Sequence, residues 1–226
     1  MARLIQIVIR VFVGSILFAG VPLLAWGIAD FQGFVAHPAR FAFLVVTVLL
    51  QVIAVVEFPG AGSSGSKGKK LVRQQQRAVV ALQIISLAMV IVPPFTDAHA
   101  IAVIDAPDLV RCVGLIACAL GFLLMNWSAA VLGKQFSTSV TIQEDHQLVT
   151  AGPYRAVRHP RYLGIFLCNL GIALVFRSWL GVLIVAALTG VLLWRIHDEE
   201  ALMHQEFGAD WEAYAGHSRR LVPFVW

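Results

Sequence analysis

The chain has 226 residues, of which 59% are hydrophobic and 13% are charged, and its mean hydropathy is +0.80. Soluble domains contain about 45–50% apolar and about 25% charged residues, so this composition excludes a soluble globular domain and a disordered chain. The three cysteines form no CxxC pair and indicate neither a disulfide framework nor a thiolate metal site. The composition predicts an all-α, polytopic membrane helix bundle, in which the net charge of +4 reflects topology rather than nucleic-acid binding.

Six apolar runs predict about six membrane spans, since a helix needs about 17–25 apolar residues to cross a bilayer. They lie at residues 11–29, 41–58, 78–95, 112–132, 162–176 and 179–194. Arg3 and Arg10 precede the first run, but that run is longer than the roughly 7–15 apolar residues of a signal peptide, so we expect an uncleaved span. Only Arg177 and Ser178 separate the last two runs. One helix over both would be about 50 Å long, so we predict a C-terminal helical hairpin.

The basic residues indicate how the spans are oriented. All but three of the 17 lysines and arginines lie before the first run, between the second and third, between the fourth and fifth, or after the sixth. The exceptions are Arg40, Arg111 and Arg177. Under the positive-inside rule, both termini and the loops rich in basic residues are therefore cytoplasmic.

Polar residues concentrate in three stretches of the second half, and the first covers residues 143–162, QEDHQLVTAGPYRAVRHPRY. Gly152 and Pro153 predict a turn. Pro160 disfavours helical conformation at His159 but suits the first position of a helix, so we predict a helix start there. Backbone N–H groups at such a start suit a carboxylate or phosphate. The alternative is an interfacial anchor, because Arg and Tyr are common at headgroup level.

The second stretch covers residues 194–207, WRIHDEEALMHQEF. Arg195 and Glu199 share a helix face, where they could hold a zwitterionic ligand or form a simple helix ion pair. Arg195 is expected to end the last apolar helix, and a charge within the bilayer costs about 2.5–3.5 kcal/mol, which favours a functional role. Another face carries His197, Glu200 and His204. We expect no metal there, because membrane di-metal oxygenases need several more histidine clusters.

The third stretch covers residues 207–226, FGADWEAYAGHSRRLVPFVW. Trp211 and Tyr214 give it an amphipathic, interfacial character. We predict a short helix followed by a tail that packs back over the site. A simple membrane-surface anchor is the alternative.

One longer motif runs through all three stretches. It reads LVTAGPYRAVRHPRYLG over residues 148–164, followed by Arg195, Glu199, Glu200, Phe207, Gly208, Trp211, Tyr214 and Pro223. In this pattern, residues 130–226 resemble the isoprenylcysteine carboxyl methyltransferase family. The resemblance implies an integral-membrane enzyme that transfers a methyl group from S-adenosylmethionine to a carboxylate on a prenylated or other lipophilic acceptor. It implies nothing for the first four spans.

The resemblance also assigns roles to individual residues. The implied cofactor-binding residues are His146, Gln147, Leu148, Val149, Tyr154, His159, Pro160, Arg161, Tyr162 and Glu199. Arg195 is implied to face the methyl acceptor, so Arg195 and Glu199 are the expected catalytic residues. Gln143 is a candidate for a glutamine that the family places upstream. The chain then divides into N-terminal transmembrane helices, residues 1–132, and a catalytic region, residues 133–226.

The chemistry of methyl transfer is compatible with this site. Transfer from a sulfonium is an in-line displacement that requires no metal, so positioning and removal of water can supply the catalysis. The attraction between a sulfonium and a carboxylate strengthens in a dry pocket. A polar cofactor would enter from the cytoplasm, whereas a lipophilic acceptor would enter sideways from the membrane lipid. We therefore expect a cytoplasmic cofactor pocket without metal.

Two other classes of protein stay open. A membrane sterol or enone reductase that uses NADPH would carry a similar HPxYxG turn. Such enzymes usually follow the turn with an acidic residue, whereas Ile165 follows Gly164 here, which favours the methyltransferase. A non-enzymatic membrane scaffold or transporter would use its basic loops only for orientation. Loss of cofactor binding in a folded Glu199 or His159 variant would distinguish an enzyme from that class.

Overall fold

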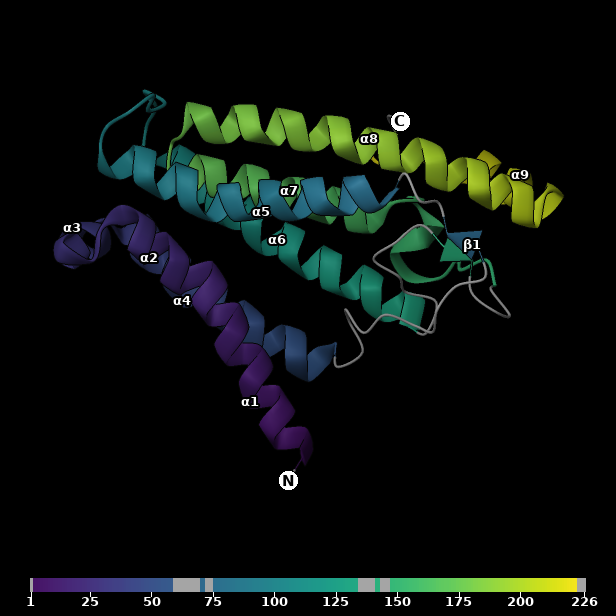
Figure 1. Cartoon of the computed structure of the whole chain (residues 1–226), viewed down its shortest axis with the longest axis horizontal. Coiled ribbons are helices and arrows are strands. Elements are labelled where there is room, and N and C mark those ends of the chain that lie inside the picture. Colours follow the sequence, from purple (N-terminus) through teal and green to yellow (C-terminus); the bar gives the residue numbers. More distant parts are fainter. Residues whose placement is uncertain (1, 59–69, 72–74, 134–140, 143–146, 223–226) are drawn as a thin grey trace.

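The computed structural model describes residues 2–58, 70–71, 75–133, 141–142 and 147–222 (Figure 1). The long helices are α4 (Pro38–Glu57), α5 (Gln75–Ala98), α6 (Leu109–Leu132), α7 (Pro160–Val175) and α8 (Trp179–Phe207). The first span combines α1 (Ala2–Ser15), the π-helical turn η1 (Ile16–Gly20) and α2 (Val21–Trp26). The shorter elements are η2 (Ile28–Asp30), α3 (Phe31–Ala36), η4 (Gly152–Arg155), α9 (Ala209–His217) and the antiparallel strands β1 (Lys70–Leu71) and β2 (Thr141–Ile142).

Within the described residues, five helical segments are long and apolar enough to cross a membrane. They are Ile7–Trp26, Pro38–Glu57, Arg77–Ala98, Leu109–Leu132 and Trp179–Phe207. The fifth predicted run, residues 162–176, forms α7, which has 16 residues. At about 24 Å, this helix is shorter than the roughly 30 Å hydrocarbon core. The predicted membrane helix bundle is confirmed, and the chain is an integral, multi-pass membrane protein.

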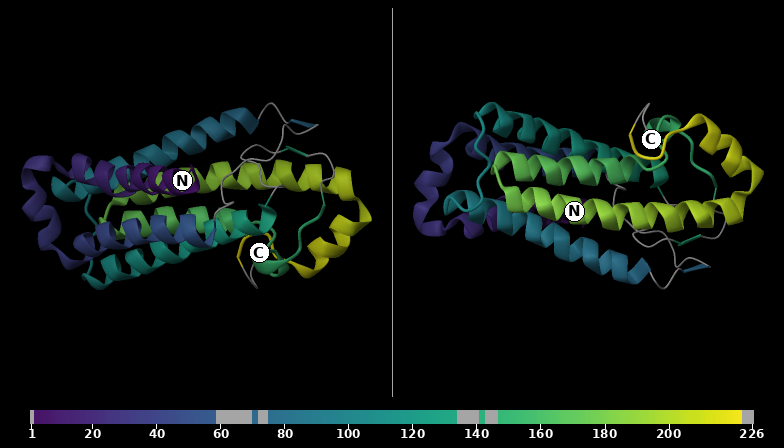
Figure 2. Two further views of the ribbon diagram at one scale, coloured as in Figure 1. Left: turned by 90° about the horizontal axis from the view of Figure 1, so that it is seen from below. Right: turned by 90° about the horizontal axis from the view of Figure 1, so that it is seen from above.

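Helices α5, α6, α7 and α8 run roughly along the long axis of the molecule and alternate in direction (Figures 1 and 2). At one end lie α3 and the α5–α6 and α7–α8 connections. At the other end, α7 begins, α8 continues into α9, and α6 finishes. Helices α1 and α4 pack against each other and diverge from the remaining helices toward the N-terminus (Figure 1).

Facing glycines allow α6 and α7 to approach closely. A Cβ atom added to Gly121 would lie 2.6 Å from the carbonyl oxygen of Gly164, and one added to Gly164 would lie 2.7 Å from that of Gly121. Gly114 and Gly171 face each other in the same way. Small residues favour helix packing in membranes because the backbones can come together. This contact fixes the position of α7, and hence of the residues in its first turn.

The predicted hairpin between α7 and α8 is confirmed. Its turn contains Arg177 with a φ of 44°, and Ser178 caps α8 by accepting a hydrogen bond from the N–H of Gly181 at 2.9 Å. The hydroxyl of Thr96, near the end of α5, donates to the Ser178 hydroxyl at 2.8 Å. The turn is therefore tied to the neighbouring helix as well as to its own.

Arg195 follows the apolar part of the last helix, as predicted, but it does not end the helix itself. Helix α8 does not stop near Trp194 but continues to Phe207. The residues beyond Trp194 include good helix formers such as Glu, Leu and Gln, and several pair with neighbouring elements, so the helix extends past its apolar part. Arg195 consequently lies inside a rigid helix.

Asp97, near the end of α5, binds Arg40 and Arg111. These are two of the three arginines that lie outside the loops rich in basic residues. The Asp97 carboxylate accepts hydrogen bonds from Arg111 at 2.8 and 2.9 Å and from Arg40 at 3.2 Å. The third arginine, Arg177, donates to the carbonyl oxygen of Ala106 at 3.3 Å. Arg111 is 1% exposed, and the Asp97 carboxylate compensates its charge inside the fold.

Candidate active site

A single tyrosine hydroxyl links the two predicted catalytic residues. Tyr162, in the first turn of α7, is 7% exposed, and its hydroxyl donates to Oε2 of Glu199 at 2.7 Å. The same hydroxyl accepts from Nε of Arg195 at 3.2 Å. Arg195 and Glu199 lie one helical turn apart on α8, so both side chains reach the same side of the helix. The arrangement holds a guanidinium and a carboxylate in fixed positions around one hydroxyl.

His159 supports this tyrosine from the residue that precedes α7. Helix α7 begins at Pro160, as predicted, and the pyrrolidine ring suits that position. The imidazole of His159 stacks on the ring of Tyr162 with a centroid distance of 5.6 Å and an angle of 11°. Its Nε2 lies 3.3 Å from Oε1 of Glu200. His159 therefore connects the start of α7 to α8.

Glu200 joins the segment before α7 to the C-terminal tail, and we call this set of contacts the Glu200 clasp. Its Oε1 accepts from Nε of Arg158 at 2.8 Å, and its Oε2 accepts from Nε of Arg220 at 2.9 Å. Arg158 also donates to the carbonyl oxygens of Ala215 and Ser218 at 2.8 and 2.7 Å. Charge-assisted contacts of this kind are stronger than neutral hydrogen bonds. The clasp thus holds α9 and the tail against the site.

Backbone pairing reinforces the clasp. The N–H of Arg158 donates to the carbonyl oxygen of Arg219 at 2.7 Å, and the N–H of His159 donates to the carbonyl oxygen of Arg220 at 3.0 Å. In return, the N–H of Arg219 donates to the carbonyl oxygen of Ala156 at 3.0 Å. The predicted short helix is α9, and the tail packs back beside the start of α7. Both predictions are confirmed up to Val222, where the described residues end.

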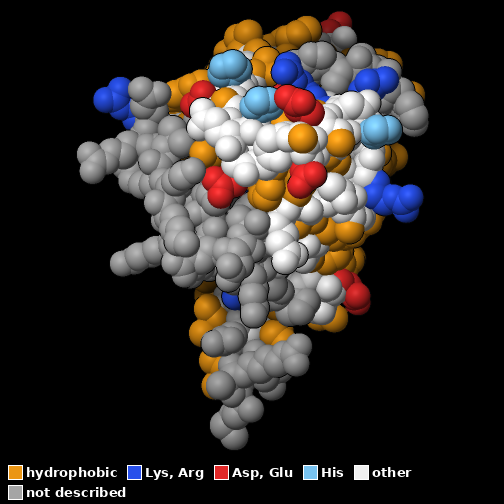
Figure 3. Space-filling model, turned by 90° about the vertical axis from the view of Figure 1, so that its right-hand side faces the viewer, with side chains coloured by type: hydrophobic (Ala, Val, Ile, Leu, Met, Phe, Trp, Pro, Cys, Tyr) orange, Lys and Arg blue, Asp and Glu red, His pale blue; other side chains and the backbone are white. Residues whose placement is uncertain are grey.

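Two tyrosines attach α9 to the rest of the site. The Tyr214 hydroxyl donates to the backbone carbonyl oxygen of Tyr154 at 2.8 Å, and the Tyr154 hydroxyl donates to the backbone carbonyl oxygen of Ser128 on α6 at 3.4 Å. Burial raises the pKa of Tyr214 to about 12 and raises the pKa of Tyr154 as well, so both hydroxyls keep their protons at neutral pH. Histidine, acidic and basic side chains gather on this end of the molecule (Figure 3).

The structure brings several of the predicted cofactor residues together. The network around Tyr162 contains His159, Arg195 and Glu199, with Pro160 at the start of the same helix. The segment of Gln147, Leu148 and Val149 has no regular structure and leads to η4, where Tyr154 is buried. His146 and Gln143 lie outside the described residues.

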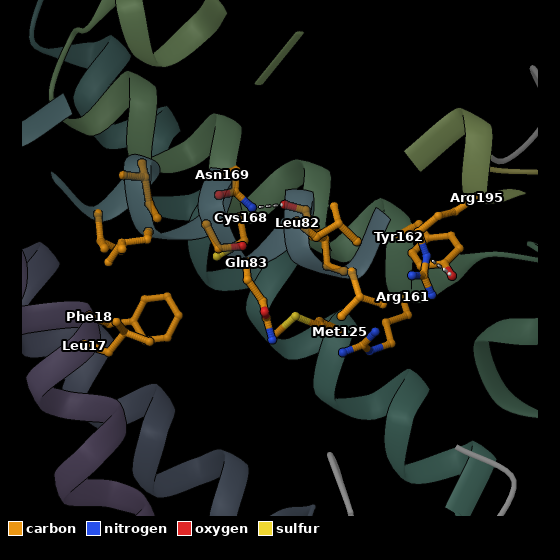
Figure 4. Close-up of a pocket in the computed structure, with 16 residues that line it drawn as sticks. Leu17, Phe18, Leu82, Gln83, Met125, Arg161, Tyr162, Cys168, Asn169 and Arg195 are labelled. Atoms are coloured by element: carbon orange, nitrogen blue, oxygen red, sulfur yellow. Dashed lines mark hydrogen bonds between the residues drawn. The ribbon is translucent and has the colours of Figure 1, made fainter. Parts of the chain in front are cut away.

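An apolar cavity of about 440 Å³ begins beside this network (Figure 4). One end is lined by Arg161, Tyr162 and Arg195, and the other by Leu17 and Phe18 of η1. Between them, the walls are formed by Val79, Leu82, Gln83, Ser86, Leu87 and Val90 of α5, Met125 of α6, and Ile165, Cys168, Asn169 and Ile172 of α7.

Sequence reasoning missed this cavity because it assigned no function to the first four spans. The available signal was weak: Gln83 and Asn169 are amide side chains inside otherwise apolar runs, and both line the cavity. Arg161 was expected to bind the cofactor. The structure places it on the cavity wall together with Arg195.

His197, Glu200 and His204, the three residues considered for a metal site on α8, do not share a common contact. Glu200 forms the clasp, and Nε2 of His204 lies 2.9 Å from Oε1 of Glu212 on α9. His197 is exposed. Among the residues that the structure describes, no group of three His, Cys, Asp or Glu side chains is arranged to hold a metal ion.

Comparisons with known proteins agree with the motif. Residues 109–210 match the family model described as "Phospholipid methyltransferase". A "Probable protein-S-isoprenylcysteine O-methyltransferase" of Oryza sativa subsp. indica is 29% identical over 120 residues, which are 50% of this chain and 61% of the relative. The "Protein-S-isoprenylcysteine O-methyltransferase" of Schizosaccharomyces pombe is 38% identical over 117 residues, 46% of each chain. The comparisons confirm the resemblance to the isoprenylcysteine carboxyl methyltransferase family.

The extent of these matches differs between sequence and structure. The match covers less than two thirds of the length of the rice relative. "Protein-S-isoprenylcysteine O-methyltransferase A" of Arabidopsis thaliana is 31% identical, and the match covers 58% of its length. A solved structure titled as the eukaryotic intramembrane Ras methyltransferase ICMT matches 96% of this chain and 98% of its own, with a TM-score of 0.49 and 16% identity. That structural likeness is too distant to add to the argument.

Proposed function

We propose that this chain is an integral-membrane methyltransferase that uses S-adenosylmethionine to methylate a carboxylate on a lipophilic acceptor of the isoprenylcysteine type. One observation carries the proposal: Arg195 belongs both to the polar network around Tyr162 and to the wall of the apolar cavity. A cation inside a membrane protein usually marks a functional site. Here it stands at the end of a cavity that suits a lipid chain ending in a carboxylate. The names of the relatives support the same reaction.

The acceptor would lie along the cavity with its carboxylate at the arginine end. Arg161 and Arg195 line that end together. Guanidinium groups bind carboxylates through paired N–H donors, which fixes the orientation of both oxygens. The remaining walls are largely apolar and would bury the lipid chain, at about 0.8 kcal/mol per methylene group.

The residues on the other side of Tyr162 fit a cationic methyl donor. The Glu199 carboxylate is held there by the Tyr162 hydroxyl, and its charge would attract a cation in a site with little water. We propose that His146, Gln147, Leu148, Val149, Tyr154, His159 and Pro160 complete the cofactor pocket. Bound S-adenosylmethionine would supply the methyl group from its positively charged sulfonium, and the sulfur would leave as the neutral thioether of S-adenosylhomocysteine.

The protein's own contribution is positioning. The acceptor carboxyl group has an ordinary pKa of about 3.5, so it is already ionised at neutral pH and no general base is required. Arg195 would orient one carboxylate oxygen and leave the other free to attack. Tyr162 keeps Arg195 and Glu199 in register, and the tail held by the Glu200 clasp would exclude water.

We also propose how the chain is divided and oriented. Residues 133–226 would carry the catalytic network, whereas residues 1–132 would provide much of the acceptor cavity. The basic loops and both termini would face the cytoplasm, where the polar cofactor is available. The membrane lipid would then have access to the cavity from the side.

Transfer of labelled methyl tests this function. Purified full-length protein in lipid nanodiscs is incubated with methyl-labelled S-adenosylmethionine and an S-prenylated N-acetylcysteine. The control acceptor is the methyl ester of the same compound, which has no free carboxylate. We expect label in the free acid only. Equal labelling of both compounds would refute carboxyl transfer, and NADPH-dependent reduction of an enone without methyl transfer would favour the reductase.

A further inference from the structure

The first span contains a π-helical turn where it reaches the cavity. The N–H of Val21 donates to the carbonyl oxygen of Ile16, five residues earlier, instead of the usual four. Such turns are rare and occur frequently at functional sites. Leu17 and Phe18 belong to this turn, and they are the residues of the first span that line the cavity.

These two side chains lie at the end of the cavity away from the arginines (Figure 4). The α7 wall runs from Tyr162 to Ile172, which corresponds to about 15 Å along the helix. Ile172 and Val90 are 1% and 2% exposed, so α5 and α7 close their sides of this end, whereas Leu17 is 39% exposed and forms part of its outer wall. The cavity therefore has a polar end and an apolar end at a fixed separation.

Phe18 is also held in position. Its ring packs edge to face against Phe122 of α6, with a centroid distance of 6.0 Å. Aromatic pairs in this geometry add to the energy of burial. This contact favours one position of the ring, in which it forms part of the cavity wall.

We propose that Phe18, assisted by Leu17, sets the maximum length of the acceptor's hydrocarbon chain. This inference rests on the proposed function, because the chain in question belongs to the methyl acceptor. Arg161 and Arg195 anchor the carboxylate at one end, so the far end of the chain reaches a depth fixed by its length. A chain that fits gains from each buried methylene, whereas a longer chain must displace the Phe18 ring or leave the cavity.

A series of N-acetyl-S-alkylcysteines with saturated chains, lengthened in steps of two methylene groups, tests this limit. In the wild type, kcat/KM should rise by about fourfold per added methylene and then stop rising at one chain length. In Phe18→Ala the break should move to a longer chain, so that a compound two methylenes beyond the wild-type break gains about 15-fold. Leu17→Trp should move the break to a shorter chain.

Phe12→Ala is the matched control. Phe12 lies on α1 of the same first span, is 64% exposed and does not line the cavity, so the break should stay at the wild-type length. An unchanged break in Phe18→Ala, or an equal shift in Phe12→Ala, would overturn the inference. If Phe18→Ala does not fold, Phe18→Leu provides the same test with a smaller loss of volume.

Binding separates this inference from the proposed function. The same series is measured without cofactor, by displacement of a fluorescent fatty acid from the purified protein. A break in affinity that moves with Phe18, in a protein that transfers no methyl, would refute the proposed reaction and keep the length limit. Methyl transfer with a break that is the same in every variant would keep the reaction and refute the length limit.

Discussion

The hydroxyl of Tyr162 donates a 2.7 Å hydrogen bond to Glu199 while accepting one from Arg195. Tyr162→Phe removes both contacts and keeps the ring that stacks on His159. Hydrogen bonds to charged groups contribute about 1.5–3 kcal/mol, so we expect kcat/KM to fall by about 10–100-fold. Because both contacts also exist in the resting protein, the melting temperature should fall as well, by several degrees. Steady-state methyl transfer and thermal unfolding in the same detergent measure the two quantities. Wild-type kcat/KM in this variant would show that the hydroxyl has no positioning role.

Arg195→Lys should separate acceptor binding from cofactor binding. Lysine keeps the positive charge but lacks the planar pair of N–H donors that orients a carboxylate. We expect the acceptor KM to rise and kcat to fall, by about tenfold or more in kcat/KM. The affinity for S-adenosylhomocysteine, measured by calorimetry, should stay close to that of the wild type. A large loss of that affinity alone would place Arg195 in the cofactor site instead.

Glu199→Gln should weaken binding of the charged cofactor more than that of its neutral product. Only S-adenosylmethionine carries the sulfonium, so removal of the carboxylate charge should reduce its affinity relative to S-adenosylhomocysteine by about tenfold, or about 1.4 kcal/mol. Glutamine still accepts the hydrogen bond from Tyr162, which keeps the local geometry. Equal losses for both ligands would mean that Glu199 does not contact the sulfonium.

Glu200→Gln should loosen the tail. The substitution removes the charge shared by Arg158 and Arg220, and we expect the free energy of unfolding to fall by about 2 kcal/mol. Limited proteolysis between α9 and the C-terminus should become faster than in the wild type. Glu212→Gln is the control, because its contact with His204 is exposed, and such pairs contribute about 0–1 kcal/mol. Equal proteolysis of both variants would argue against the clasp.

Gly121→Ala should disrupt the α6–α7 contact. The new methyl group would lie 2.6 Å from the backbone carbonyl of Gly164, so the helices must separate, at a cost of about 1–3 kcal/mol or more. Gly190→Ala is the control on α8, since no atom lies within 4 Å of its added Cβ, and alanine is the better helix former. Melting temperatures should fall for the first variant and stay level or rise for the second. Similar melting temperatures would show that the α6–α7 contact adapts.

The sequence predicted the membrane helices, the α7–α8 turn, the start of α7 and the returning tail, because each follows from local composition or from proline placement. It placed residues 195–204 on helix faces but did not predict that they continue the apolar helix without a break, since an apolar window ends where hydropathy falls, not where a helix ends. The cavity could not be predicted either. Leu17 and Phe18 come together with Ile172 only through the packing of helices far apart in the chain, and a π-helical turn leaves no clear pattern in an apolar run.

The Asp97 carboxylate has a consequence for how the protein is made. It lies on α5 and binds Arg40 at the start of α4 and Arg111 near the start of α6. The two arginines therefore reach a compensated environment only after three separate helices have been inserted and have met. A shortened chain that begins after α4 would therefore leave Asp97 with one of these two guanidinium partners.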